Sequence, residues 1–214
     1  MSSFFGTSVT KKIVMALAGL FLIVFLMVHL GINFFLLSDD PTSFNTAAHF
    51  MASNPIIKVF ELVLIGGILI HILWGVILQI QNWTARPDRY KVTASTQTSF
   101  FSKYMIYTGL IILIFLIIHF VNFYFVKLGL VEGDHENFYG MAHELFKIPG
   151  YIVFYLVSFI ILSFHLNHAF QSAFQTLGLN HQKYTSCIKT LGLIYSIVIP
   201  LGYIIIPVII YFSK

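Results

Sequence analysis

Five long apolar stretches, separated by short polar segments, dominate the chain. About 20 apolar residues cross a hydrocarbon core roughly 30 Å thick, and each stretch reaches that length. The segments between them carry the Pro, Asp, Asn, Gly and Ser that are typical of turns. The pattern predicts an all-α bundle of five transmembrane helices in one domain, residues 1–214, with spans at about 12–37, 55–81, 103–126, 150–177 and 187–212.

Composition supports a membrane protein and excludes several other classes. The chain is 58% hydrophobic and only 9% charged, with a mean hydropathy of +0.88, whereas soluble domains are about 25% charged. The net charge of +4 is not gathered on one segment, so we expect no nucleic-acid partner. The single cysteine, Cys187, excludes an in-chain iron–sulfur cluster of the usual four thiolates and a C-x-x-C-H haem attachment site.

Charged residues alternate between the two ends of the spans. The first and third loops are acidic, whereas the N-terminus and the second and fourth loops hold eight of the twelve basic residues: Lys11, Lys12, Arg86, Arg89, Lys91, Lys103, Lys183 and Lys189. By the positive-inside rule, the N-terminus is cytoplasmic and the C-terminus lies outside.

Histidines occupy four of the five spans. An ionisable residue inside a membrane helix usually marks function. One residue rises about 1.5 Å along a helix, so His29 and His119 lie about 12 Å from the outer end of their spans. His71 and His165, on helices that run inward, lie about 24 Å from the outer end.

The two depths predict two histidine pairs. Two imidazoles that face each other across a bundle are what a six-coordinate haem requires. A zinc site would gather three or four ligands at one depth, and a proton relay would follow one path, usually with carboxylates. We therefore predict two haems b that only transfer electrons, one between His29 and His119 and one between His71 and His165. His168, about 4.5 Å nearer the cytoplasm, is the alternative ligand on the fourth span, or a partner for a haem propionate.

A few other polar residues are weaker candidates. Glu61 lies about 9 Å below the outer end, where a carboxylate could accept protons from a quinol; alternatively it pairs with Lys58 or snorkels. His49 is a weaker candidate for the same role. We expect the remaining loop histidines to be solvated, namely His135, His143 and His181. We expect the basic residues of the second loop to contact headgroups, haem propionates or an acidic partner; they are Arg86, Arg89 and Lys91.

Four stretches resemble a known family. They are Lys11-Lys12-Ile13-Val14-Met15-Ala16-Leu17-Ala18-Gly19-Leu20 followed by His29; Ile70-His71-Ile72-Leu73-Trp74-Gly75; Phe115-Leu116-Ile117-Ile118-His119; and His165 through Gln171-Ser172-Ala173-Phe174-Gln175-Thr176-Leu177-Gly178. Together they resemble the five-helix, dihaem cytochrome b anchor subunit of bacterial succinate dehydrogenases and quinol:fumarate reductases, over nearly the whole chain.

The resemblance implies a function and partners. It implies an outer haem on His29 and His119 and an inner haem on His71 and His165. It also implies an FAD-bearing flavoprotein subunit and an iron–sulfur subunit on the cytoplasmic face, and a quinone, menaquinone in this branch. The setting would be the bacterial cytoplasmic membrane, in respiration and the tricarboxylic acid cycle, with assemblies that could pair as dimers. One departure is Ser163, where some members carry a proton-transferring Glu.

Two alternatives remain. A dihaem quinol-oxidising subunit of another respiratory complex would share the cofactors, although such subunits typically place two ligands on one helix. A haem-free membrane transporter could use the same histidines as polar contacts between helices. A reduced-minus-oxidised spectrum of the purified protein distinguishes a haem protein from the haem-free transporter.

Overall fold

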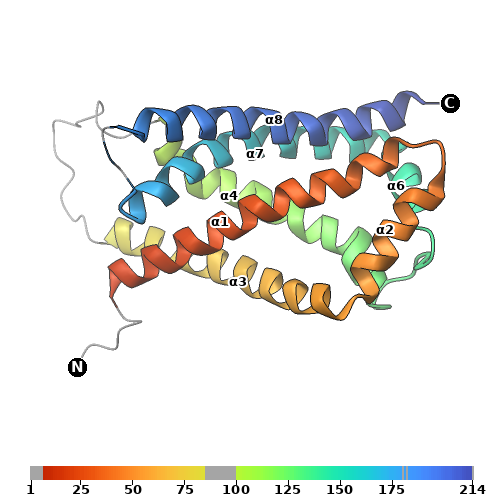
Figure 1. Cartoon of the computed structure of the whole chain (residues 1–214), viewed down its shortest axis with the longest axis horizontal. Coiled ribbons are helices and arrows are strands. Elements are labelled where there is room, and N and C mark those ends of the chain that lie inside the picture. Colours follow the sequence, from red (N-terminus) through yellow and green to blue (C-terminus); the bar gives the residue numbers. More distant parts are fainter. Residues whose placement is uncertain (1–6, 85–99, 180, 182, 214) are drawn as a thin grey trace.

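The computed structural model describes residues 7–84, 100–179, 181 and 183–213 (Figure 1). Over these residues the chain is helical, without strands. Five helical segments are long and apolar enough to cross a membrane, namely Val9–Leu37, Pro55–Thr84, Tyr104–Lys127, Pro149–Thr176 and Thr185–Phe212. The all-α prediction with five spans is confirmed, and the fold fits a multi-pass membrane protein.

Each span is built from one helix or a helix with a short continuation. The first comprises α1 (Ser8–Asn33) and the 3-10 turn η2 (Phe34–Leu37). The third comprises α4 (Phe100–His119), the π-helical turn η3 (Phe120–Tyr124) and α5 (Phe125–Lys127). The remaining spans are α3 (Pro55–Thr84), α7 (Pro149–Thr176) and α8 (Thr185–Phe212).

Two short helices that the sequence analysis treated as loops cover one end of the bundle. They are α2 (Pro41–Ser53) and α6 (Phe138–Phe146), and both lie at the end where the chain finishes (Figure 1). Asp40 caps α2 by accepting a hydrogen bond from the Thr42 amide, which holds the pKa of that carboxyl below its usual value. Asn45 joins the two helices, because its amide donates to Asn137 Oδ1 at 3.1 Å and its Oδ1 accepts from the Tyr139 amide at 3.0 Å.

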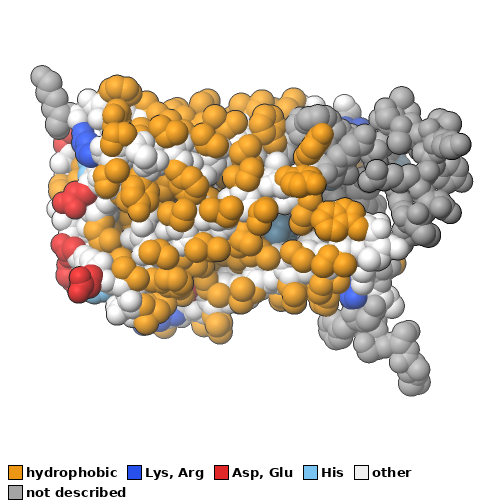
Figure 2. Space-filling view, turned by 180° about the vertical axis from the view of Figure 1, so that it is seen from behind, with side chains coloured by type: hydrophobic (Ala, Val, Ile, Leu, Met, Phe, Trp, Pro, Cys, Tyr) orange, Lys and Arg blue, Asp and Glu red, His pale blue; other side chains and the backbone are white. Residues whose placement is uncertain are grey.

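Large apolar side chains cover the outside of the spans. Leu62 on α3 is 74% exposed, Ile56 is 66% exposed, and Val153 on α7 is 58% exposed. Figure 2 shows this apolar surface along the bundle, with Asp and Glu side chains gathered at one end. A face of this kind is stable against lipid and not against water.

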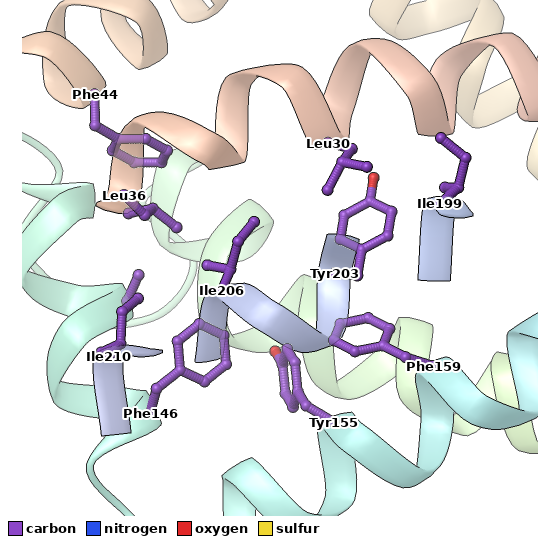
Figure 3. Close-up of a cluster of buried hydrophobic side chains, with 11 residues drawn as sticks. Leu30, Leu36, Phe44, Phe146, Tyr155, Phe159, Ile199, Tyr203, Ile206 and Ile210 are labelled. Atoms are coloured by element: carbon purple, nitrogen blue, oxygen red, sulfur yellow. The ribbon is translucent and has the colours of Figure 1, made fainter. Parts of the chain in front are cut away.

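Four of the spans form a bundle, and α8 packs against its side. Helix α1 packs against α3 and α7, α4 packs against α7, and α3 meets α4 only thinly. On α8, the Tyr195 and Tyr203 hydroxyls donate to the carbonyls of Ile23 and Leu26 on α1, at 2.5 and 2.8 Å. A buried cluster between α1, α6, α7 and α8 fills the half of the bundle nearest α2; it includes Leu30, Phe146, Tyr155, Phe159 and Ile206 (Figure 3).

The four-helix bundle consists of two similar halves. The segments Gly19–His29 and Gly109–His119 both read Gly-Leu-x4-Phe-Leu-x2-His, with an apolar residue at every x. The segments Pro55–His71 and Pro149–His165 both start a helix with Pro and reach a histidine sixteen residues later. Because α1 packs on α3 as α4 packs on α7, the pairs α1–α3 and α4–α7 form an internal repeat. The connectors between the matching segments are unlike, which makes this repeat hard to recognise from the sequence alone.

Ser163 compensates for a proline in α8. In a helix the Ser196 carbonyl would accept from the amide of residue 200, but Pro200 has no N–H. The Ser163 hydroxyl on α7 donates to that carbonyl at 2.5 Å instead, and α8 remains helical from Thr185 to Phe212. Where polar backbone groups lie in hydrocarbon, such compensation is required. This contact gives Ser163 a structural role.

We predict that Ser163 and Pro200 are energetically coupled. Ser163→Ala should lower the free energy of unfolding in mixed micelles by about 1 kcal/mol, because it leaves the Ser196 carbonyl unpaired. In a Pro200→Ala background the backbone N–H is restored, so Ser163→Ala should be close to neutral there. Equal losses in both backgrounds would contradict the assignment.

Candidate functional site

Two pairs of histidines face each other inside the bundle. The rings of His29 on α1 and His119 on α4 have centroids 5.9 Å apart and planes at 86°. The rings of His71 on α3 and His165 on α7 have centroids 6.4 Å apart and planes at 71°. Each pair therefore takes one residue from each half of the internal repeat.

The spacing of both pairs suits an ion held between two imidazoles. A bond from a metal to an imidazole nitrogen is about 2.0 Å long. The nitrogen lies about 1 Å from its ring centroid, so an in-line arrangement separates two centroids by roughly 6 Å. The observed 5.9 and 6.4 Å match this value. The residues present thus fit a bis-histidine haem, and within the described part of the chain no group of three or more His, Cys, Asp or Glu could hold a metal ion.

Aromatic and hydroxyl side chains orient the His29–His119 pair. Phe25 stacks on His29, with ring centroids 5.1 Å apart, and Phe115 stacks on His119 at 5.6 Å. The His119 Nδ1 atom also lies 3.4 Å from the hydroxyl oxygen of Tyr155. Ligating histidines are usually held through their second ring nitrogen in this way. Sequence reasoning missed these residues, although each Phe precedes its His by four positions, the spacing that stacks side chains on one helix face.

Glycines bring the backbone of a neighbouring helix close to the His71–His165 pair. A Cβ atom added to Gly19 would lie 3.6 Å from His71 Cε1, and one added to Gly109 would lie 3.6 Å from His165 Cε1. These distances are ordinary van der Waals contacts, so each glycine backbone lies directly beside a ring. The two contacts are equivalent in the repeat.

The two candidates on α7 differ in their surroundings. His165 faces His71, whereas His168 lies one turn further along and is half-buried. The structure therefore brings His165 into the pair and leaves His168 beside it. A role for His168 toward a propionate stays a prediction.

Glu61 forms an ion pair with a residue that the sequence analysis did not consider. The Lys127 Nζ atom on α5 lies 2.6 Å from Glu61 Oε2, and the two side chains are 26% and 21% exposed. Lys58, on the same helix, contributes a second nearby positive charge. Glu61 thus joins α3 to the end of the third span, where α3 and α4 otherwise meet thinly.

The loop histidines have varied surroundings. His49 lies 2.8 Å from Glu136 at the exposed end of the bundle, and His135 and His181 are exposed, as expected. The expectation of a solvated His143 was wrong. Its Nε2 lies 3.0 Å from the Leu36 carbonyl oxygen, and its ring stacks on Tyr139 at 4.0 Å.

The basic second loop lies outside the described residues, so the contacts expected of Arg86, Arg89 and Lys91 stay predictions.

Comparisons of the chain with protein-family models, with curated proteins and with solved structures give no match. The function is therefore inferred from the residues and their geometry.

The pairing predicts two classes of variant. If each pair holds one haem, His29→Ala and His119→Ala should both remove, or convert to high spin, the same haem signal, because each deletes one histidine of that pair. His71→Ala and His165→Ala should both affect the other signal. Optical and electron paramagnetic resonance spectra of the assembled protein measure the two signals.

His168→Ala is the matched control on α7, and it should keep two low-spin signals. Loss of the same haem in His29→Ala and His71→Ala would contradict the pairing.

Proposed function

We propose that this chain is the membrane anchor and electron-transfer subunit of a succinate:quinone oxidoreductase, either a succinate dehydrogenase or a fumarate reductase. One observation carries the proposal: two histidine pairs at haem spacing, each pair formed by one residue from each half of the repeat. The resemblance of the ligand-bearing stretches to dihaem anchor subunits supplies the class of enzyme.

The two pairs would lie at different depths in one bundle. Gly19 contacts His71, and His29 lies ten residues further along α1, so the pairs are about 15 Å apart along the helix axis. The repeat gives the same offset on α4 between Gly109, beside His165, and His119. An electron route across most of the membrane thickness needs such stacked sites.

Two haems b would supply reversible one-electron transfer when bound. The chain's own residues would hold each iron from both faces, which leaves no open coordination position for oxygen or substrate. The apolar helices around the pairs would separate the bound groups from water. The quinone, menaquinone by the resemblance, would be converted at the end of this route.

The charge pattern supports one orientation of the complex in the membrane. Lys11, Lys12, Lys183 and Lys189 lie toward the end of the spans opposite α2 and α6, and the acidic loops lie at the α2 end. On the positive-inside rule the N-terminus is cytoplasmic and the C-terminus outside, in a bacterial cytoplasmic membrane. The flavoprotein and iron–sulfur subunits would then dock on the cytoplasmic face, nearest the His71–His165 pair.

The proposal predicts about two haems b per chain, because each histidine pair accommodates one. A pyridine haemochrome assay on the purified protein, combined with chain quantification, measures this ratio. No haem should stay attached after acid–acetone extraction, since the chain has a single cysteine. One haem per chain would break the two-pair arrangement, and a colourless preparation from haem-replete cells would reject the proposal.

We further predict that Glu61 serves quinone chemistry. Glu61→Gln keeps the size of the side chain but cannot accept a proton, so quinone-linked turnover should fall by about tenfold or more. Both haem spectra and succinate oxidation by artificial acceptors should be unchanged. Steady-state assays with quinone and dye acceptors separate the two activities.

Two controls accompany this variant. Glu144→Gln removes a carboxylate from α6 and should leave quinone turnover unchanged. Lys127→Gln removes only the ion-pair partner of Glu61. If Glu61→Gln retains full quinone activity, the carboxylate serves only to join α3 to the third span.

A further inference from the structure

A threonine holds one histidine of the His71–His165 pair through its second ring nitrogen. Thr108 lies on α4, directly before Gly109, and its Oγ1 atom is 3.1 Å from His165 Nδ1. The same hydroxyl donates to the backbone carbonyl of Met105 at 3.0 Å. His165, the Thr108 hydroxyl and the Met105 carbonyl therefore form a short chain of hydrogen bonds.

This chain of hydrogen bonds favours one tautomer of His165. A threonine hydroxyl has one proton, and a carbonyl can only accept. When the Thr108 hydroxyl donates its proton to the Met105 carbonyl, it can offer only a lone pair to His165. Nδ1 must then carry the hydrogen in neutral His165, which leaves Nε2 unprotonated. That is the form of imidazole that binds a metal through Nε2.

The other half of the repeat lacks this support. The residue equivalent to Thr108 is Ala18, directly before Gly19, and the equivalent of Met105 is Met15. His71 Nδ1 is buried without a hydrogen-bond partner. The Met15 carbonyl lies beside the His71 ring, without the geometry of an ordinary hydrogen bond to Nδ1. The two histidines of one pair are thus supported unequally.

We propose that Thr108 is a positioning residue that fixes the tautomer and orientation of His165, and that the Thr108/Ala18 difference tunes the haem held by His71 and His165. The proposal rests on the proposed function, because it requires a haem between these rings. An Nδ1–H that donates to an oxygen raises the basicity of the ligating nitrogen. A more basic ligand favours ferric iron and lowers the midpoint potential.

The test uses the complete complex in its native membrane and compares four single variants. Thr108→Val keeps the shape of the side chain and removes the hydroxyl, and Thr108→Ser retains the hydroxyl. Ala18→Thr installs the missing hydroxyl on α1, and Ala18→Val is its matched control. Potentiometric titration followed optically gives both midpoint potentials, and electron paramagnetic resonance of the ferric form reports the ring orientations.

Thr108→Val should raise the midpoint potential of the His71–His165 haem and shift its resonance, and should leave the other haem unchanged. Thr108→Ser should behave as the wild type. Ala18→Thr should lower the same potential relative to Ala18→Val. Selective loss of this haem in Thr108→Val, with retention in Thr108→Ser, would also support positioning.

Two results would overturn the inference. The positioning role fails if Thr108→Val and Thr108→Ser both match the wild type, or if both lose the haem. The tuning by unequal support fails if Ala18→Thr and Ala18→Val have the same potential. Failure of the proposed function is distinguishable from either, because wild-type complex would then contain no low-spin haem to titrate.

Discussion

Hydrocarbon cannot hydrogen-bond, and this constraint explains most of the specific contacts in the bundle. Every polar group placed inside a span must find its partner within the chain. The Ser163 hydroxyl therefore meets the carbonyl that Pro200 leaves free, and Tyr195 and Tyr203 bond to backbone oxygens of α1. Against this background a buried His71 Nδ1 without a partner is unusual. This unpartnered nitrogen belongs to one of the two histidine pairs, and a ligand site can contain polar groups that packing alone would not accommodate.

The internal repeat gives the histidine pairs their geometry. Each half contributes one histidine near the α2 end and one nearer the N-terminal end, and in each half a glycine of the first helix lies beside the histidine of the second. The halves differ at many positions around this common frame, including neighbours of the histidines. Glu61 occupies the place of Tyr155, and Ala18 that of Thr108. The equivalent positions therefore carry different chemistry, a carboxylate in an ion pair against a phenol beside His119.

Much of this architecture could be predicted from the sequence, because apolar length and helical rise are local properties. The five spans and the depths of His29 and His71 follow from counting residues. Helices α2 and α6 were missed because they are too short to cross a membrane, although Asp40 and Asn137 cap them. Contacts between distant segments were beyond reach: His143 meets a carbonyl 107 residues away, and Glu61 pairs with Lys127 across 66 residues. The sequence alone did not identify Thr108, because its contact with His165 joins residues that are 57 positions apart.

Because each histidine pair draws on both halves of the repeat, the order of synthesis has a consequence for assembly. Neither half contains a complete pair, so a truncated chain ending after α3 could not retain a cofactor at either depth. As the ribosome proceeds, the His29–His119 pair becomes available with the third span, and the His71–His165 pair only with the fourth. A haem iron held at either site, as proposed, would link the first half of the repeat to the second.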